Sequence, residues 1–459
     1  MWYDSFMKKQ DKLILFSILC VLFSLLSLQL LAFESGQTPG KGSMPLYPSI
    51  LPEEKQTEIV NDWLKIRLDT VLPEVMRREK IDMWIIICRE YNEDPVFLTL
   101  MPAQTYSARR TSILVFFDQG EKGLERLIVQ PYVGGKLYKA AWTHGQNDQW
   151  QCLADIVEKR NPKRIGINES DTFAFGDGLT ASLKAKLLKT LGKKFTSRLC
   201  SAENVAVGWL EKRIPQELEV YPYIVSIAHA IIAEAFSNRV IVPGISTTDD
   251  VQWWMLKKIK QLGLNPWFHP WVDLQRPEKG KPNESISGII QPGDLLHCDL
   301  GITYLRLNTD TQEHAYVLKK DETDVPGGLK EALQVGNRLQ DIFTAEFKEG
   351  ITGNQLLRIA LSKSRELGIN GQIYTHPLGY HGHGAGPVIG LWDNQNGVPG
   401  RGDYPLYYDT CHAVELNARV PIPEWNNQVV RIALEQDAAF TLTGVHYLDG
   451  RQTTFHIIK

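Results

Sequence analysis

The chain has 459 residues, of which 43% are hydrophobic and 22% are charged. This ordinary globular composition excludes a disordered, collagen-like or fibrous protein, and the length allows two or three domains. Fifty basic residues against 53 acidic residues give a net charge of −3. Because no basic excess is present to neutralise phosphates, nucleic acid is not expected as a partner.

The N-terminal region departs from this average composition. Residues 13–33 carry no charge, and they follow the basic residues Lys8, Lys9 and Lys12. A basic flank before an apolar run is typical of a secretory signal or a signal anchor, and this run is long enough to span a bilayer. We therefore expect residues 1–34 to be a signal peptide or membrane anchor. The protein would be exported to the periplasm or the extracellular space, or held at the membrane.

Patterning after the apolar run predicts an α/β domain. Residues 35–53 are rich in Gly, Ser and Pro and indicate a linker. A helical apolar pattern then extends to Lys80, and strand-like runs alternate with a further helical stretch. The predicted strands are 83–88, 112–118, 126–129 and 164–167, and the predicted helix is 179–191. Strands interleaved with helices favour a compact α/β domain over residues 54–205.

The remaining residues, 206–459, predict an α+β domain. A helical pattern covers 216–237, and two capping boxes begin later helices that end at glycines. The capping boxes and stops are Thr247 with Asp250 before Gly263, and Thr352 with Gln355 before Gly368. Predicted strands cover 295–303, 314–318, 413–420 and 429–441. Helices among antiparallel hairpins indicate the α+β class.

Six cysteines are present, and no pair has the C-x-x-C spacing of a zinc knuckle or a thioredoxin-like site. Cys20 lies in the apolar run. The other five are odd in number, and several lie in apolar strand-like runs. We therefore expect buried free thiols.

Two aspartates form the first candidate for chemistry. Asp299 ends an apolar strand, and Asp310 follows it eleven residues later, so a hairpin would bring both carboxylates to one end. Solvated aspartates are common, and this pair alone is weak evidence. An unpaired carboxylate at the end of an apolar strand is costly, however, and a metal ion is one way to satisfy it.

A glycine-rich segment and two strand glutamates complete the candidate site. Residues 379–387 contain His381 and His383 among glycines, which let the backbone approach a centre closely. A surface loop with incidental histidines is the alternative. Glu415 and Glu435 each interrupt an apolar strand-like run, although a single strand glutamate usually faces water.

The ordered set Asp299, Asp310, His383, Glu415 and Glu435 resembles metallopeptidase family M24, which includes prolidase, aminopeptidase P and methionine aminopeptidase, with creatinase as a fold relative. The D-x10-D hairpin, the G-H-G-x-G segment at 382–386 and the two strand glutamates carry the resemblance, which covers residues 55–459. It implies an α+β pita-bread catalytic domain of the creatinase/aminopeptidase type, preceded by a creatinase-type α/β N-terminal domain.

The resemblance also implies two divalent metal ions, Mn²⁺ foremost, with Co²⁺, Zn²⁺ or Fe²⁺ as alternatives; carboxylates and imidazole suit such ions. Asp310 and Glu435 would bridge them, Asp299 would bind one, and His383 with Glu415 the other. A metal-bridging hydroxide would attack a peptide bond next to proline, and Glu415 would also move a proton to the leaving nitrogen. Family habit further suggests a homodimer.

Three departures from the family pattern are visible. A further family histidine, seven residues after the ligand histidine, is replaced by Gly390. A histidine expected before the first aspartate is missing, and His269 is rather distant. The arginine after the second aspartate's threonine is replaced by Gln312. We expect His376, His381 or Trp392 to supply replacement contacts, with the two histidines as candidate catalytic residues.

Two functions therefore remain open. The first is an exported dinuclear-metal Xaa-Pro aminopeptidase or dipeptidase-like enzyme, with Tyr380 and Trp392 as candidate walls of a proline pocket. The second is a creatinase-fold binding protein with weak or no catalysis, because accessory histidines are missing. A creatinase-like amidinohydrolase is disfavoured, since that enzyme works without metal.

Overall fold

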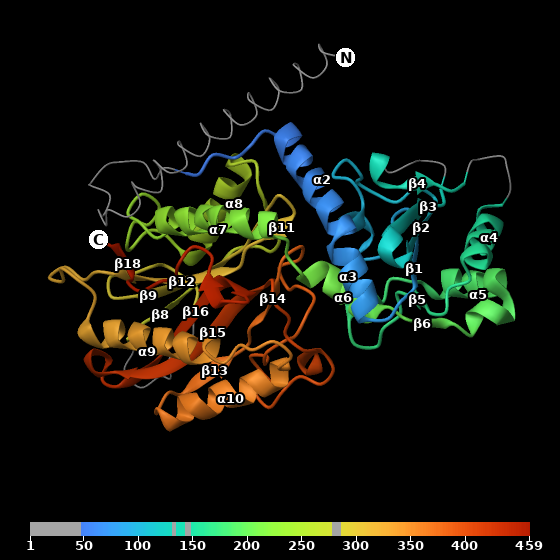
Figure 1. Cartoon of the computed structure of the whole chain (residues 1–459). Coiled ribbons are helices and arrows are strands. Elements are labelled where there is room, and N and C mark those ends of the chain that lie inside the picture. Colours follow the sequence, from blue (N-terminus) through green and yellow to red (C-terminus); the bar gives the residue numbers. More distant parts are fainter. Residues whose placement is uncertain (1–46, 131–134, 143–147, 278–285) are drawn as a thin grey trace, which may run out of the picture. The chain divides into compact units, whose positions relative to one another are not determined.

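The computed structural model describes residues 47–130, 135–142, 148–277 and 286–459 (Figure 1). Residues Tyr47–Lys459 form one compact unit. The predicted signal or anchor at 1–34 lies outside the described residues, as does most of the predicted linker at 35–53. The membrane-anchoring residues 13–33 are therefore not described.

The N-terminal half contains a mixed sheet flanked by helices. The sheet has the order β4-β3-β2-β1-β5-β6, in which β1 pairs antiparallel with β2 and parallel with β5. Its strands are β1 (Met83–Arg89), β2 (Thr111–Asp118), β3 (Leu124–Ile128), β4 (Lys139–Ala140), β5 (Ile165–Ile167) and β6 (Leu199–Ser201). Its helices are α2 (Glu53–Asp69), α3 (Val71–Arg78), α4 (Gln149–Arg160), α5 (Ala181–Thr196) and α6 (Glu203–Glu211). The predicted α/β class is confirmed.

Two details differ from the sequence-based expectation. The single helix expected up to Lys80 is interrupted at Thr70, so that α2 and α3 are separate. The predicted domain boundary after residue 205 falls inside α6. The division into domains stays a prediction.

A larger, mostly antiparallel sheet dominates the C-terminal half. Its main path is β13-β15-β16-β12-β9-β8, with β14 beside β15, β17 beside β16 and β18 beside β12. The strands are β8 (Trp271–Gln275), β9 (Leu295–Leu300), β12 (Thr311–Val317), β13 (Gly371–Ile373), β14 (His376–Leu378), β15 (Thr410–Ile422), β16 (Gln428–Thr441), β17 (Gly444–Tyr447) and β18 (His456–Ile458). A small sheet joins β7 (Asn265–Pro266), β10 (Ile302–Tyr304) and β11 (Leu307–Asn308).

Two pairs of helices enclose the larger sheet. α7 (Pro215–Ala235) and α8 (Thr248–Gln261) pack on strands β8, β9 and β12, whereas α9 (Gly327–Thr344) and α10 (Gly353–Glu366) pack on β13, β15 and β16 (Figure 1). Separate hydrophobic clusters fill the two interfaces. The predicted α+β architecture is therefore confirmed.

The predicted helix ends are also confirmed. Thr247 Oγ1 accepts a hydrogen bond from the Asp250 backbone N–H at 3.1 Å, and Thr352 caps Gln355 in the same way at 3.2 Å. The stop glycines Gly263 and Gly368 have φ values of 76° and 72°, which a glycine adopts without strain. Local sequence chemistry thus sets these boundaries.

Helix α7 is long and apolar enough to cross a membrane by length and composition alone. Its apolar face, which includes Ile224 and Ile231, is fully buried in the hydrophobic core. It is therefore a central core helix. The cysteines follow their prediction: those in the described residues are free, with Cys200 half-buried and the others buried.

Candidate active site

A row of polar side chains crosses the middle of the larger sheet. Asp299 on β9 pairs with Gln312 on β12, Gln312 pairs with Glu435 on β16, and Glu435 pairs with Glu415 on β15. Directly opposed residues of antiparallel strands point to the same face of a sheet. Four neighbouring strands therefore present these side chains side by side on one face of the sheet.

Asp310 joins this row from the residue before β12, two positions ahead of Gln312. The potential ligand atoms form three overlapping groups: Asp299 with Asp310 and Glu435, His376 with Glu415 and Glu435, and Asp310 with His376 and His383. Within the described residues, Asp299 Oδ1, Asp310 Oδ1, Glu435 Oε1 and His376 Nε2 are buried and have no hydrogen-bond partner. Such orphaned atoms are rare in buried sites.

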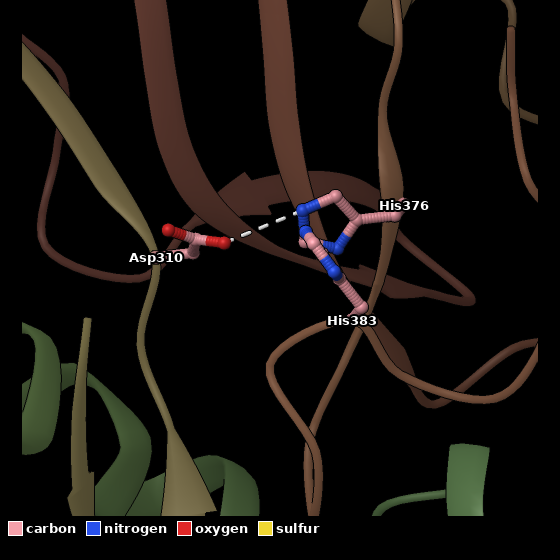
Figure 2. A group of neighbouring side chains, drawn as sticks. All are labelled: Asp310, His376 and His383. Carbon is pink, nitrogen blue, oxygen red and sulfur yellow. Dashed lines mark ion pairs between the residues drawn. The ribbon is translucent and has the colours of Figure 1, made fainter. Parts of the chain in front are cut away.

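His376 faces the Asp310 carboxylate (Figure 2). Its Nε2 lies 3.3 Å from Asp310 Oδ2 and 3.5 Å from Glu435 Oε1. Its Nδ1 is 3.0 Å from the Pro377 carbonyl oxygen, a contact that places a proton on Nδ1 and leaves Nε2 to face the centre. Burial alone favours the neutral ring, but Glu435 and Glu415 raise the pKa of His376 to about 9.

His383 lies beside His376, with ring centroids 4.7 Å apart, and its own side chain is exposed (Figure 2). The Trp267 ring contacts it at 5.1 Å. The preceding residue, Gly382, needs to be glycine because a Cβ there would lie 2.1 Å from the Trp267 ring. Although part of the side chain is exposed, the imidazole packs against the Trp267 and His376 rings, and this partial desolvation together with the charge of His376 lowers the pKa of His383 to about 4, so that its imidazole is neutral.

The carboxylates repel one another in this buried site. Burial raises the pKa of Asp299 to about 6 and that of Glu415 to about 7. Burial and neighbouring carboxylates hold the pKa values of Asp310 and Glu435 well above their usual range. A cation would relieve this repulsion, and the carboxylate oxygens and imidazole nitrogens are donors that suit divalent ions.

Gln312 organises the two glutamates, a role that the sequence did not reveal. Its Nε2 donates to Glu435 Oε2 at 2.8 Å and also to Glu415 Oε1. Its Oε1 lies 2.8 Å from His297 Nε2, and His297 Nδ1 lies 3.3 Å from Asp273 Oδ1. Although burial opposes its ionisation, His297 lowers the pKa of Asp273 to about 2. The sequence feature that could have indicated this role is the position of Gln312, two residues after Asp310 in a strand.

Gly390, where the resemblance expects a histidine, cannot carry a side chain. Its φ is 76°, and a Cβ would lie 2.2 Å from the Ile373 carbonyl oxygen. The expected separation of seven residues between two histidines does occur when it is counted from His376, which faces the carboxylates. Counted from His376, the position seven residues later is His383. His269, the other candidate accessory residue, contacts Trp253 at 5.0 Å between ring centroids and does not line the cavity described next.

A cavity of about 660 Å³ opens beside His383. Its lining residues are Glu93, Asp94, Pro95, Leu98, Thr99, Phe175, Trp267, Thr303, Arg306, Asn308, Tyr380, His381, Gly382 and His383. His381 packs on Phe175 with ring centroids 4.4 Å apart, and burial with the charge of Arg213 lowers its pKa to about 4. Tyr380 lines the cavity as expected for a pocket wall, whereas Trp392 is 72% exposed and lies outside the lining.

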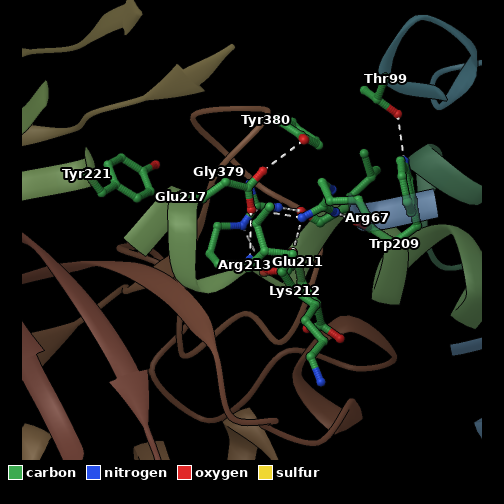
Figure 3. Close-up of polar contacts among 12 residues, drawn as sticks. Arg67, Thr99, Trp209, Glu211, Lys212, Arg213, Glu217, Tyr221, Gly379 and Tyr380 are labelled. Atoms are coloured by element: carbon green, nitrogen blue, oxygen red, sulfur yellow. Dashed lines mark hydrogen bonds and ion pairs between the residues drawn. The ribbon is translucent and has the colours of Figure 1, made fainter. Parts of the chain in front are cut away.

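A buried network of ion pairs holds the hydroxyl group of Tyr380 (Figure 3). The Tyr380 hydroxyl donates to Glu217 Oε1 at 2.9 Å. Arg67 Nη1 lies 2.9 Å from Glu217 Oε2, and Arg213 Nη1 lies 3.6 Å from Glu217 Oε1. The three charged side chains are fully buried. Helix α2, the start of α7 and the histidine-bearing loop are thereby joined.

Comparison with known proteins gives a family match for the C-terminal region. A sequence profile of metallopeptidase family M24 matches residues 223–438, which contain all of the clustered carboxylates and histidines. A search of curated proteins finds no match.

Solved structures show the same fold at low identity. The chain resembles an X-Pro aminopeptidase from Thermotoga maritima, with a TM-score of 0.60, 17% identity, and coverage of 84% of this chain and 99% of that one. For an Xaa-Pro dipeptidase from Bacillus anthracis, the TM-score is 0.57 and the identity 15%, with coverage of 86% of this chain and 99% of that one. For a prolidase from Pyrococcus horikoshii, the TM-score is 0.54 and the identity 16%, with coverage of 87% of this chain and 99% of that one. Residues 223–438 therefore match metallopeptidase family M24, and the chain has the pita-bread fold of these structures.

Proposed function

We propose that the chain is a dinuclear-metal-dependent peptidase that hydrolyses the peptide bond next to proline in Xaa-Pro substrates. The observation that carries this proposal is the set of buried ligand atoms of Asp299, Asp310, His376 and Glu435 that have no hydrogen-bond partner. They form adjoining groups that share Glu435, as two neighbouring cations require. The named activities of the M24 structural relatives support the same substrate class.

Asp310 and Glu435 would be shared by both cations, for which we propose Mn²⁺. Asp299 would bind on one side, and His376 with Glu415 on the other. This assignment moves the ligand role from His383 to His376, because His376 Nε2 faces both shared carboxylates. When bound, two such cations polarise a scissile carbonyl and activate water for hydrolysis.

The remaining residues handle protons and position the substrate. Glu415 is half-buried and its pKa is raised by burial to about 7, so it can exchange a proton near neutrality. His383 and His381 present neutral imidazoles at the cavity wall, where they can hydrogen-bond a peptide. The rings of Trp267 and Phe175 offer apolar surface to a proline ring.

The experiment measures bound metal and peptide hydrolysis in the purified protein with added Mn²⁺, using Xaa-Pro dipeptides and longer peptides. We expect two ions per chain and turnover in the wild type. The Asp299→Asn variant should lose both the bound ions and turnover. The Asp324→Asn variant should keep both, because Asp324 is an exposed carboxylate that pairs with Lys330. Two bound ions without turnover of any such peptide would instead support the binding-protein alternative.

Export and self-association are proposed on sequence grounds alone. The basic flank and apolar run at 13–33 support export, with either cleavage or membrane anchoring. N-terminal sequencing of the exported protein and fractionation of cells test this, and a chain retained in the cytoplasm would contradict it. The homodimer rests on the family resemblance, and sedimentation of the purified protein tests it.

A further inference from the structure

Trp271 extends the polar row by one strand, to the end of the main path of the larger sheet. Strand β8 is the last strand of that path, and Trp271 pairs directly with Asp299 on β9. Directly opposed residues of antiparallel strands point to the same face of a sheet, with Cβ atoms about 4.5–5.5 Å apart. The indole therefore belongs to the face that carries the candidate metal ligands, next to Asp299.

A hydrogen bond fixes the direction of the indole ring. Trp271 Nε1 donates to Asp273 Oδ2 at 3.3 Å, and Asp273 Oδ1 in turn lies 3.3 Å from His297 Nδ1. Because Asp273 follows Trp271 by two residues in the same strand, its side chain points to the same face. The nitrogen-bearing edge of the ring is thus held toward this buried pair.

The Trp271 side chain is nevertheless half exposed. Its exposed fraction is 50%, whereas Val272 and Leu274 on the same strand are fully buried against the helices. Within the part of the chain that the structure describes, it is the one exposed large apolar side chain that stands opposite a candidate metal ligand. A tryptophan offers a rigid apolar surface with a polar edge, and such residues are enriched where proteins bind ligands and partners.

The cavity proposed for proline leads from the metal ligands in another direction. Its lining residues include Thr303 and Asn308, which lie between the end of β9 and the start of β12, and Trp271 is not one of them. A peptide whose scissile carbonyl lies at the metal ligands, and whose proline enters this cavity, has to place the preceding side chain elsewhere. The indole beside Asp299 offers apolar surface for that side chain.

We propose that Trp271 contacts the side chain of the substrate residue that precedes proline, so that the site prefers peptides with a large apolar or aromatic residue at this position. This inference rests on the proposed peptidase function and narrows its substrate class. A large apolar side chain buries area against the indole, and an aromatic one adds a contact between the two rings. A glycine at this position makes neither contact.

The test compares Phe-Pro with Gly-Pro on the wild type and on Trp271→Ala, both loaded with Mn²⁺. We expect the wild type to prefer Phe-Pro by about 10-fold or more in kcat/KM, as is usual for an apolar group in a pocket. Trp271→Ala should lose most of this preference, chiefly through a higher KM for Phe-Pro, and should change Gly-Pro little. Trp271→Phe, which keeps an aromatic ring without the N–H group, should retain part of the preference.

Trp253→Ala is a matched control. Trp253 is 53% exposed, but it lies on α8 and its ring contacts His269. The control variant should keep the wild-type preference for Phe-Pro. Equal losses on Phe-Pro and Gly-Pro in Trp271→Ala would show that Trp271 only holds Asp273 in place, and would overturn the inference. A wild type that does not prefer Phe-Pro would overturn it as well.

If no Xaa-Pro peptide is hydrolysed, the proposed function fails separately. Calorimetric binding of the same two peptides then decides the role of Trp271. The wild type should bind Phe-Pro about 10-fold more tightly than Gly-Pro, and Trp271→Ala should remove this difference. A wild type and a Trp271→Ala variant that bind the two peptides alike would overturn the inference.

Discussion

Gln312 and Glu435 lie opposite each other on β12 and β16, and the Gln312 amide donates to Glu435 Oε2 at 2.8 Å. The same amide nitrogen donates to Glu415. At the other end of the amide, Gln312 Oε1 lies 2.8 Å from His297 Nε2. Gln312 therefore fixes the positions of two candidate metal ligands without being one.

Replacing Gln312 with methionine should lower metal affinity about 10–100-fold, as is typical when an outer hydrogen-bond partner of a ligand is lost. Competition with a chelator measures this. Gln252→Met serves as a control, because Gln252 is also buried but donates to the Val272 carbonyl oxygen. An unchanged affinity in Gln312→Met would contradict the positioning role.

Asp310→Asn should stabilise the metal-free protein and abolish its response to metal. In the wild type, burial and the charges of Asp299 and Glu415 disfavour the Asp310 carboxylate, and a neutral amide removes that repulsion. Mn²⁺ at 100 times Kd should add about 2.7 kcal/mol to wild-type stability and little to the variant. Thermal unfolding with EDTA or Mn²⁺ measures both effects. Equal Mn²⁺ shifts in both proteins would contradict the ligand assignment.

Gly390→Ala should destabilise the protein by about 2–4 kcal/mol, because the site has positive φ and the new Cβ would meet the Ile373 carbonyl oxygen at 2.2 Å. Gly368→Ala is a matched control: its φ is 72°, but no atom lies within 4 Å of the new Cβ. It should cost only about 1 kcal/mol. Urea unfolding compares the two, and similar losses would show that conformation alone matters.

Glu217→Gln should cost about 3–5 kcal/mol, because it leaves Arg67 and Arg213 buried with their shared carboxylate removed. Glu58→Gln, in an exposed pair with Lys55, should change stability by less than about 1 kcal/mol. Urea unfolding of the metal-free proteins measures both. Similar small effects would show that the buried network has little energetic role.

His229 should make stability depend on pH. Burial favours its neutral form, but the hydrogen bond that His229 Nδ1 donates to Asp449 Oδ2 and the charges of Glu313 and Asp437 raise its pKa to about 9. The pKa of His229 in the folded protein lies above the ordinary value of 6.5. The stabilisation that protonated His229 gives the folded protein is therefore complete below pH 6.5 and is lost as pH rises through 9. It amounts to about 3 kcal/mol at most.

Urea unfolding at pH 6 and pH 9.5, in EDTA, measures the effect in wild type and in Asp449→Asn. The wild type should lose more stability than the variant over this interval. Parallel profiles would show that the ion pair between His229 and Asp449 contributes nothing to the pH dependence.

Sequence patterns predicted the local features of the fold because those features depend on neighbouring residues. The capping boxes at Thr247 and Thr352 and the strands that carry Asp299 and Glu435 are of this kind. Helix α9 was missed, since its sequence begins with Gly327 and contains further glycines that weaken the helical signal. The break at Thr70 was missed because the apolar periodicity continues across it.

The site itself was predictable only in part. Five residues were selected from their order along the chain, but the choice between His376 and His383 depends on the pairing of β14 with β15, which spacing does not reveal. The contact of Gln312 with Glu435 likewise depends on strand register. Arg67 and Glu217 are ordinary helix residues in sequence, and only tertiary packing buries them together.

The polar row across β9, β12, β16 and β15 has a kinetic consequence. Its members come from distant parts of the chain, so the site has a high contact order and exists only after β16 has docked between β12 and β15. A nascent or partly folded chain in which β16 has not yet docked lacks Glu435, and it cannot assemble the carboxylate pair proposed to be shared by the two cations. Stable metal uptake would then mark the completion of folding, because the last strand of the row to be synthesised completes the binding site.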